Sequence, residues 1–564
     1  MSKLSAVIGS LKDPVVIDDS DDEADAKVAA ASKPAEQVVP TKASISTSSL
    51  SMSPNSQMRS IRAESKRRWQ QKALDTADDV KSDANTSVVK KPRIEEQQQS
   101  DDHTDVPIKI FTTELPRQTS SPLTAKHCRS LRQLIGLEGP EELKSTIGWM
   151  VIFNYIIDFD YLLDTIPELV SIPNVTVFYG SGSGSPHYWK QMNPQIHLQQ
   201  LVPSDPPNSA TNPLGFKIHY GVHHTKMFLV GLADGTLRVI IHTANLMHSD
   251  VSLKTQGAYV QDFPLKTAKS LSCEFETDMV AYLRTYKYNQ PRNWSTTGEV
   301  RSLRDEIQRY DFTSAKVVLI PSTPGRNNLD NPKGYVKLSQ AIRKHVPKRD
   351  TPKPIVCQFS SIGSLSVKWL QEIAKSWDTA RSDCNKEDLQ HRLKLVYPTV
   401  DEIRDSVEGY RGGGSVPGNR KNTSKDCLRP LYHKWSSSES NPLHKPHNVP
   451  HIKTFYQLTD NETSMEWFCL TSHNLSKAAW GETINTDQGR LIFTRHWELG
   501  VFVVPQLFRK DCKLVPAGSR SGDNQIAVPM PFQLNPTKYG LTDHPWAVDG
   551  IYSQADRFGR KGCM

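Results

Sequence analysis

Two His-x-Lys triplets contain the residues of this sequence that are best suited to chemistry. His224 and Lys226 form the first, and His451 and Lys453 form the second, a domain length further along the chain. A neutral imidazole is a nucleophile, a protonated one is an acid, and an ammonium group stabilises an anion. The triplets therefore suit reaction at a phosphate ester, whose transition state spreads negative charge over its oxygens.

Each triplet is followed by a strand, a turn, a second strand and an Asn-Leu pair. The expected strands are 227–230 and 238–242 before Asn245, and 454–458 and 465–471 before Asn474. Such hairpins would return each asparagine beside its own triplet, and strand alternation would place the histidine and lysine on one face. One His-x-Lys triplet arises readily by chance, but the matched ending indicates a duplicated site. The open alternative is a pair of surface strands with polar outer faces.

These side chains provide every group that phosphodiester hydrolysis requires. Lys226, Lys453, Asn245 and Asn474 would supply fixed cations and donors to the phosphate. One histidine would attack phosphorus while the other protonates the leaving oxygen and then activates water, so the expected intermediate is a covalent phosphohistidine. No cofactor and no metal are expected, because the sequence offers no paired-carboxylate cage.

A metal site is the alternative for one stretch of the second half. His444, His447 and His451 have a spacing that permits shared coordination of an ion. Pro446 and Pro450 interrupt any helix that would align the three imidazoles. The two prolines therefore argue against the metal site.

Predicted strands and predicted helices both surround the triplets, which predicts an α/β fold with sandwiched layers. The stretch 147–163 is expected to be a buried element, and 174–179, 316–320 and 354–359 are expected to be strands. Leu365, Trp369 and Ile373 fall on one helical face, and Thr399 with Glu402 predicts a capping box. The Gly/Ser stretch 180–186 lacks the Gly-Lys-Ser/Thr ending of a P-loop, so it is interpreted as a linker-like loop.

Composition sets limits on organisation and partners. A chain of 564 residues exceeds one ordinary core, and the net charge of +8 suits a polyanionic partner. The eight cysteines are scattered, without a CxxC pair, which favours a reducing compartment over a disulfide framework or zinc site. No apolar stretch resembles a secretory signal or a membrane span, so a soluble protein without membrane contact is expected.

Residues 1–107 are expected to form a disordered regulatory and targeting tail, because they are rich in Ser and Thr and nearly free of aromatics. Residues 15–17 precede an acidic run at 18–23 and resemble a motif for small ubiquitin-like modifiers; the alternative is a solvated acidic run. Basic clusters at 66–68 and 90–93 resemble nuclear-import signals, which predicts a nuclear protein, against an alternative of generic tail charge.

From residue 108 onward the sequence resembles the phospholipase D superfamily and, within it, the tyrosyl-DNA phosphodiesterases. The stretches that carry this resemblance are 220–227, 241–246, 254–257, 322–325, 433–435, 450–454, 474–481 and 498–501. The superfamily usually has an Asp after each Lys, but Gly231 and Tyr456 stand at or near those positions. Instead of a Gly-Ser pair, Thr243-Ala244 and Ser472-His473 precede the asparagines. These departures put lipid hydrolysis in doubt and favour the tyrosyl-DNA branch.

The resemblance implies a fold and residue roles. Residues 108–310 and 311–564 would form two similar phospholipase D-like α/β/α halves with mixed sheets, related by a pseudo-twofold axis, in a monomer with one shared site. His224 would be the nucleophile and His451 the general acid and base, while Gln256 and Glu498 would orient the two imidazoles.

The implied substrate is DNA blocked at its 3′ end, single-stranded, nicked or double-stranded, carrying a tyrosyl peptide from a topoisomerase or another 3′ adduct. Tyr220 would stack on a base and Ser360 and Ser361 would donate to phosphates; the alternatives are a core aromatic and an ordinary strand-to-helix turn. Repair-scaffold proteins or a ubiquitin-like modifier would bind the tail. Rival interpretations are a lipid-directed phospholipase D, a general nuclease and a noncatalytic DNA-binding scaffold. The matched imidazole pair argues against the scaffold, since binding alone needs only cations.

Overall fold

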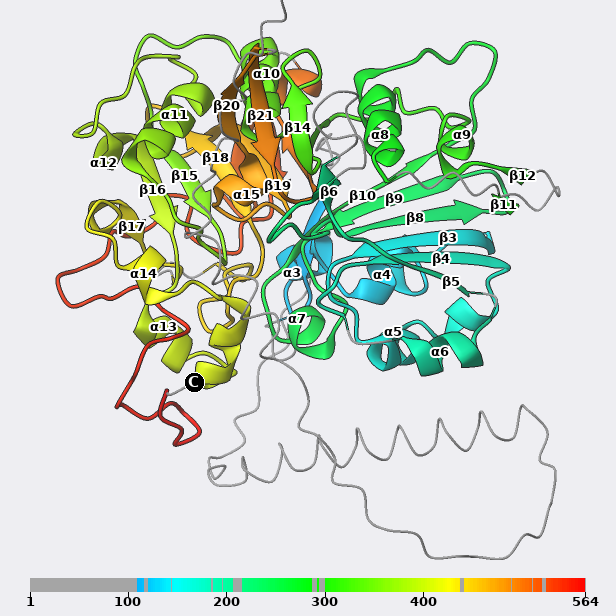
Figure 1. Ribbon diagram of the computed structural model, residues 1–564, viewed down its shortest axis with the longest axis horizontal. Helices are drawn as coiled ribbons and strands as arrows, with labels where there is room; N and C mark the ends of the chain where they lie inside the picture. The colour runs from blue at the N-terminus through cyan, green and yellow to red at the C-terminus, as the bar shows by residue number, and fades with distance from the viewer. Residues whose placement is uncertain are drawn as a thin grey trace, which may run out of the picture. The chain divides into compact units, whose positions relative to one another are not determined.

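A computed structural model (Figure 1) describes residues 109–562, except 116–119, 144, 184–185, 195, 206–215, 287–291, 294–299, 437–440, 488, 510 and 520–523. The predicted tail of residues 1–107, with its modifier motif and import clusters, lies outside the described residues.

The first half of the described chain is organised around an eight-stranded mixed sheet with the order β2-β1-β10-β9-β8-β3-β4-β5. Its strands are β1 (Ile110–Thr113), β2 (Cys128–Arg129), β3 (Ile147–Asn154), β4 (Asn174–Tyr179), β5 (Ile196–Gln200), β8 (Met227–Leu232), β9 (Leu237–His242) and β10 (Gly257–Phe263). The helices of this half are α3 (Pro122–His127), α4 (Leu131–Ile135), α5 (Phe159–Thr165), α6 (His187–Met192), α7 (His248–Ser252), α8 (Glu274–Arg284) and α9 (Leu303–Ile307). Two short ribbons pair β6 (Ser204–Asp205) with β7 (Phe216–Lys217) and β11 (Arg292–Asn293) with β12 (Val300–Arg301).

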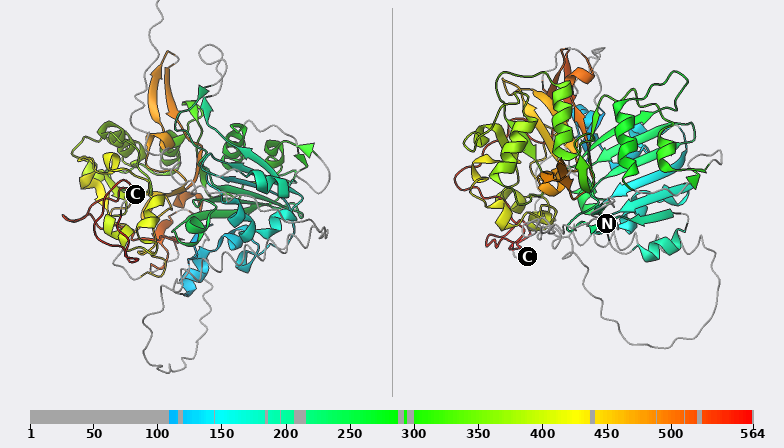
Figure 2. Two further views of the ribbon diagram at one scale, coloured as in Figure 1. Left: turned by 60° about the horizontal axis from the view of Figure 1, so that its bottom comes forward. Right: turned by 45° about the horizontal axis from the view of Figure 1, so that its top comes forward.

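The second half contains a nine-stranded sheet whose main path is β13-β22-β19-β18-β15-β16-β17. Its strands are β13 (Val318–Ser322), β15 (Ile355–Gln358), β16 (Leu393–Val396), β17 (Tyr432–His433), β18 (Thr454–Leu458), β19 (Met465–Thr471), β22 (Glu498–Val503), β23 (Lys513–Pro516) and β24 (Gln525–Val528). The helices are α10 (Gly334–His345), α11 (Val367–Trp377), α12 (Leu389–Arg392), α13 (Val400–Arg404), α14 (Arg420–Thr423) and α15 (Lys477–Trp480). A separate sheet of β14 (Gly325–Asn328), β20 (Glu482–Thr486) and β21 (Gly489–Thr494) projects beside it, with β20 and β21 drawn in orange in Figure 2.

The two large sheets repeat one topology. In the first, β1-β10-β9-β8-β3 are successively antiparallel, and β3-β4-β5 are parallel. In the second, β13-β22-β19-β18-β15 are successively antiparallel, and β15-β16-β17 are parallel. Each triplet precedes the equivalent strand, β8 or β18. This duplication confirms the predicted fold of two similar halves with mixed sheets.

Successive side chains of a strand enter different hydrophobic cores on the two faces of its sheet. Ile152 points into a core shared with α4 and α5, whereas its neighbour Phe153 points into a core shared with α8 and the second sheet. In the second half, Phe468 joins that common core and Cys469 packs in the core below α10 and α11. The sheets thus lie side by side, each with helices on its outer face (Figure 1). The predicted boundary after residue 310 falls in the connection between the sheets and stays a prediction.

Several local predictions match the elements. The strand at 174–179 is β4, the strands at 454–458 and 465–471 are β18 and β19, and Thr399 and Glu402 form a complete capping box at α13. The buried element at 147–163 divides into β3 and α5, because the Asp158 side chain caps the new helix by accepting from the Tyr161 N–H. None of the seven cysteines within the described ranges forms a disulfide. No helix in this part of the chain is long and apolar enough to span a membrane.

Candidate active site

The two histidines of the triplets are anchored to the opposite half by equivalent backbone hydrogen bonds. The His224 N–H donates to the Trp497 carbonyl at 2.9 Å, and the His451 N–H donates to the Thr255 carbonyl at 3.0 Å. Each acceptor directly precedes the residue expected to orient that histidine, Glu498 or Gln256. This reciprocity is a pseudo-twofold relationship at the level of single atoms.

The triplets lie just before their strands, as the predicted strand bounds require, so alternation along a strand is not what places the histidine and the lysine. β8 begins at Met227 and β18 begins at Thr454, one residue after each lysine. The histidine N–H groups of the extended lead-in segments bond across the interface instead of joining a ladder within their own sheet. The side chains consequently face the opposite half.

His224 is held through one ring nitrogen by a carboxylate. Its Nδ1 lies 2.8 Å from Oε2 of Glu498, the first residue of β22, and the Ser472 hydroxyl donates to the same oxygen. Burial raises the pKa of Glu498 to about 8, against the opposing effects of Lys226, Ser472 and Lys453. When Nδ1 carries a proton and donates it to Oε2, the lone pair of Nε2 is available for attack.

His451 is held by an amide and by a second carboxylate. Its Nδ1 lies 3.3 Å from Oε1 and 3.2 Å from Nε2 of Gln256, and 3.4 Å from Oδ2 of Asp250. The Thr243 hydroxyl donates to Oε1 of Gln256 at 2.7 Å, as Ser472 does to Glu498 in the other half. The carboxamide is thus oriented by its own partner.

Both imidazoles are almost fully buried, with 8% exposure at His224 and 5% at His451. Burial is the largest cause that lowers the pKa of each well below its usual value, and Lys226 and Lys453 lower both further. Burial and the two lysines thus favour the neutral form of each ring, which the nucleophile His224 requires, whereas Asp250 acts in the opposite direction on His451.

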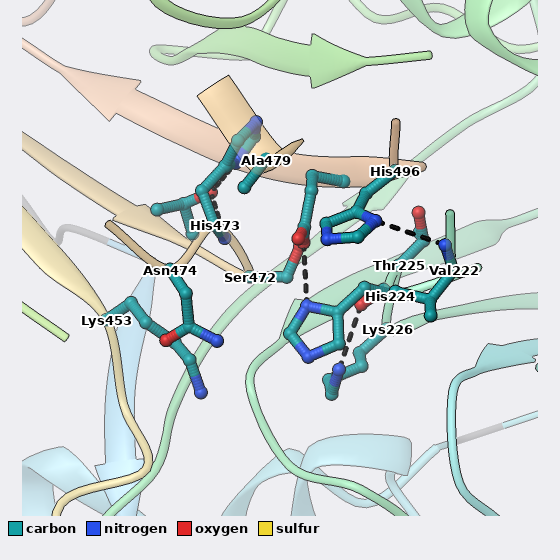
Figure 3. A network of polar contacts seen from close by, with 12 residues as sticks. Val222, His224, Thr225, Lys226, Lys453, Ser472, His473, Asn474, Ala479 and His496 are labelled. Carbon is teal, nitrogen blue, oxygen red and sulfur yellow. Dashed lines mark hydrogen bonds and ion pairs between the residues drawn. The ribbon is translucent and has the colours of Figure 1, made fainter. Parts of the chain in front are cut away.

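The two lysines converge on the same region from opposite sides. Lys226 Nζ donates to the His224 carbonyl at 2.9 Å, and Lys453 Nζ donates to the His451 carbonyl at 2.5 Å. Burial lowers the pKa of Lys226 to about 8, and that of Lys453 well below its usual value, with the charge of Lys226 as the second cause. Figure 3 shows Lys226, Lys453 and Asn474 around the His224 ring. Two lysines that face one region form a site for an anion, and a bound anion would favour the ammonium form of both.

The hairpins return both asparagines to the ends of their triplets. The Lys226 carbonyl accepts from His242 N–H, and the Lys453 carbonyl accepts from Thr471 N–H, three residues before Asn245 and Asn474 respectively. Asn245 Oδ1 is buried without a hydrogen-bond partner among the described residues. A buried polar atom of this kind marks a place that a ligand can satisfy.

Ser360 and Ser361 lie in the same site and hold Asn474. The N–H groups of both serines and the Ser360 hydroxyl donate to Asn474 Oδ1 at 3.0 to 3.2 Å. This fixes the amide so that its NH₂ group points away from the serines. Their contact with DNA stays a prediction. Tyr220 is partly exposed, with a φ of 57°, four residues before His224, and its stacking on a base also stays a prediction.

The missing superfamily aspartates have a steric explanation. A Cβ at Gly231 would lie 2.0 Å from the indole nitrogen of Trp149, so no side chain fits there without rearrangement. Tyr456 is buried, and its hydroxyl donates to the Leu534 carbonyl in the core. Carboxylates reach the histidines from other positions.

Sequence reasoning missed Asp250 and His496. Asp250 has no counterpart in the repeat, because the equivalent position five residues after Asn474 is Ala479. His496 accepts from the Val222 N–H through Nδ1 at 3.1 Å and lies beside His224 in Figure 3. Only its place two residues before Glu498 would have indicated it.

Among the residues that the structure describes, no group of three or more His, Cys, Asp or Glu side chains is arranged to hold a metal ion. His444 and His447 accordingly do not join His451 in such a group.

A duplicated mixed-sheet fold with paired His-x-Lys segments facing one another defines a phosphodiesterase of the phospholipase D type. Within that class, the family model of tyrosyl-DNA phosphodiesterase matches residues 109–540, and the chain belongs to the tyrosyl-DNA phosphodiesterase family. It is therefore a phosphodiesterase, a hydrolase, and this membership supports a DNA-repair activity.

Relatives agree in sequence and in fold. Tyrosyl-DNA phosphodiesterase 1 of Arabidopsis thaliana is 32% identical over 451 residues, which cover 73% of this chain and 71% of the relative. A probable tyrosyl-DNA phosphodiesterase of Caenorhabditis elegans is 29% identical over 427 residues, covering 72% and 83%. The crystal structure of the yeast tyrosyl-DNA phosphodiesterase has a TM-score of 0.56 at 16% identity and covers 78% of this chain and 99% of that one, which shows the shared fold.

Proposed function

We propose that this protein hydrolyses the bond between a DNA 3′-phosphate and a tyrosine left by a topoisomerase, or another 3′ adduct, through a covalent phosphohistidine and without a metal. The observation that supports this most directly is that each histidine is held at Nδ1 by side chains of the opposite half. Each Nε2 is thereby left for chemistry at a single phosphate between the halves.

In the first step, the Nε2 lone pair of His224 attacks phosphorus and the bond from phosphorus to the tyrosyl oxygen breaks. The leaving oxygen takes the Nε2 proton of His451. Lys226 and Lys453 stabilise the charge that develops on the nonbridging oxygens. Tyrosine is a comparatively good leaving group, with a phenol pKa of about 10, so the proton transfer can be late.

In the second step, His451 acts as a base. Its Nε2 takes a proton from water as the water oxygen attacks phosphorus, and the phosphorus–nitrogen bond breaks with its electron pair returning to His224. The products are a DNA 3′-phosphate and the regenerated pair of histidines. The same nitrogen of His451 thus gives a proton in one step and receives one in the next.

The contacts of the carboxylates and lysines support metal independence. Glu498 and Asp250 face the Nδ1 atoms of the two histidines, and the phosphate would be met by two ammonium groups and the amides. These cations take the place of a divalent ion in neutralising the transition state.

The proposal is tested by offering several substrates to the full chain in excess chelator. We expect turnover of an oligonucleotide that ends in 3′-phosphotyrosine, with release of tyrosine and a 3′-phosphate. Phosphatidylcholine and an unblocked oligonucleotide serve as comparison substrates for a lipase and a general nuclease. Preferential cleavage of either comparison substrate, or loss of tyrosyl cleavage in chelator, would contradict the proposal.

We also propose where the protein acts and what binds to it. The protein would act as a monomer in the nucleus, on single-stranded, nicked or double-stranded ends, with repair-scaffold proteins or a ubiquitin-like modifier bound to the tail. Import rests on the basic clusters at 66–68 and 90–93. Neutralising both clusters in a fluorescent fusion should remove nuclear accumulation, and unchanged accumulation would contradict the assignment.

A further inference from the structure

Asp250 is a buried carboxylate in the candidate site that the repeated motif does not predict. It lies in the middle of α7, is 1% exposed, and its Oδ2 lies 3.4 Å from Nδ1 of His451. Oδ2 also accepts from the Asn245 N–H at 3.2 Å, and Oδ1 accepts from the Ser415 hydroxyl at 3.3 Å. Contacts on both oxygens fix the orientation of the carboxylate toward His451.

The two halves supply their carboxylates from different positions of the repeat. His224 faces Glu498, whose counterpart in the repeat is Gln256, whereas His451 faces Asp250, whose counterpart is Ala479. Each histidine therefore has one carboxylate from the opposite half, although the positions are not equivalent. A merely inherited duplication would not produce this exchange.

We infer that Asp250 is a positioning residue that stabilises the protonated form of His451 and keeps a proton on its Nδ1. This inference rests on the proposed function of the site. Gln256 alone can accept that proton but carries no charge. The carboxylate of Asp250 offsets the positive charge that His451 must carry to act as an acid.

The charges around His451 make such an offset necessary. Lys453 from its own segment, Lys226 from the lead-in to β8 and Lys254 after α7 all disfavour an imidazolium, and Asp250 opposes them. Burial by itself would raise the pKa of Asp250, but His451, Lys254, Lys453 and the Asn245 N–H lower it to about 2. Asp250 is therefore ionised throughout the working pH range.

Lys254 links Asp250 to a loop of the second half. Its Nζ lies 3.6 Å from Oδ1 of Asp250 and 3.0 Å from Oε1 of Glu408. Because Glu408 shares this lysine, Lys254 does not fully neutralise Asp250. The remaining negative charge is available to His451.

The dependence of the rate on the leaving group separates this role from a structural one. An imidazolium acid matters most when the leaving oxygen is basic, so its loss slows tyrosine release more than release of the more acidic 4-nitrophenol. The measurement is the single-turnover rate of phenol release from two oligonucleotides, one ending in 3′-phosphotyrosine and one in 3′-(4-nitrophenyl) phosphate.

Asp250→Asn should slow tyrosine release by about 10 to 100-fold, the usual effect of removing such a partner. The factor by which nitrophenol release slows should be about tenfold smaller than the factor for tyrosine release. Asp250→Glu, which keeps the charge, should stay near the wild-type ratio of the two rates even if both rates fall. Asp262→Asn is the matched control, because that carboxylate pairs with Arg238 across strands β10 and β9 of the first sheet.

If Asp250→Asn slows the release of tyrosine and of nitrophenol equally, so that the ratio of the two rates stays at the wild-type value, the role of Asp250 is overturned. The absence of any slowing would overturn it too. If Asp250→Asn does not fold, Asp250→Ser is measured with the same prediction, since its hydroxyl can still accept from Asn245. A wild-type protein that releases nitrophenol but no tyrosine would instead contradict the proposed function.

Discussion

Nδ1 of His224 lies 2.8 Å from Oε2 of Glu498, and these residues come from opposite halves of the duplicated fold. The nucleophile that we propose is thus correctly oriented only when the two halves are packed together. The hydrophobic core that the two sheets share, which includes Phe153 and Phe468, supports that packing.

Glu498→Gln should reduce turnover of the 3′-phosphotyrosyl oligonucleotide by about 10 to 100-fold, the range typical of losing a residue that orients a catalytic imidazole. The amide can still accept from Nδ1 but no longer stabilises a positive charge on the ring of His224. Steady-state kinetics measure the change. Glu482→Gln is the control, because Glu482 forms an ion pair with Lys477 near the surface. Equal activity of the two variants would contradict the assigned orientation.

Alkaline pH should reduce kcat/KM with a midpoint near pH 8. Burial lowers the pKa of Lys226 to about 8, against the opposing effects of Glu498 and Asp250. Below that pH the lysine is an ammonium that binds phosphate, and above it the charge is lost. Since kcat/KM reports the free enzyme, the bound anion should move the midpoint of kcat to higher pH.

Lys226→Arg provides the check on this pH dependence. A guanidinium stays charged in this range, so the decline near pH 8 should disappear, while the absolute rate falls because the planar group fits differently. A decline with an unchanged midpoint in this variant would exclude Lys226 as its source.

Gly231→Ala should destabilise the fold by about 1 to 3 kcal/mol, the usual cost of overpacking a core. The new Cβ would lie 2.0 Å from the indole nitrogen of Trp149, which is itself buried. Urea-induced unfolding measures the difference. Gly414→Ala is the control, since a Cβ there has no neighbour within 4 Å. A free energy of unfolding equal to that of the control would contradict the packing explanation.

Local pattern predicted the hairpins well because strand periodicity and turn residues are properties of short segments. β18 and β19 match their predicted bounds, as does β4. The division of 147–163 into β3 and α5 depends on a cap at Asp158, which hydrophobicity alone does not reveal.

The site was predicted only as far as the repeat extends. His224, His451 and their lysines recur and were found by spacing, whereas Gln256 and Glu498 entered through family resemblance. Asp250 has no repeated counterpart and meets His451 only after the halves associate. Contacts between residues so far apart in sequence are set by tertiary packing, which spacing within one chain segment does not encode.

The central claim is that His224 and His451 act on the same phosphorus atom in two successive steps. The most direct test incubates 3′-phosphotyrosyl DNA with His451→Asn, with His224→Ala and with the wild-type protein, and maps any protein–DNA adduct by mass spectrometry. We predict a stable phosphoramide on His224 in His451→Asn, none in His224→Ala, and only a transient one in the wild type. An adduct on another residue, or wild-type turnover by both variants, would contradict the claim.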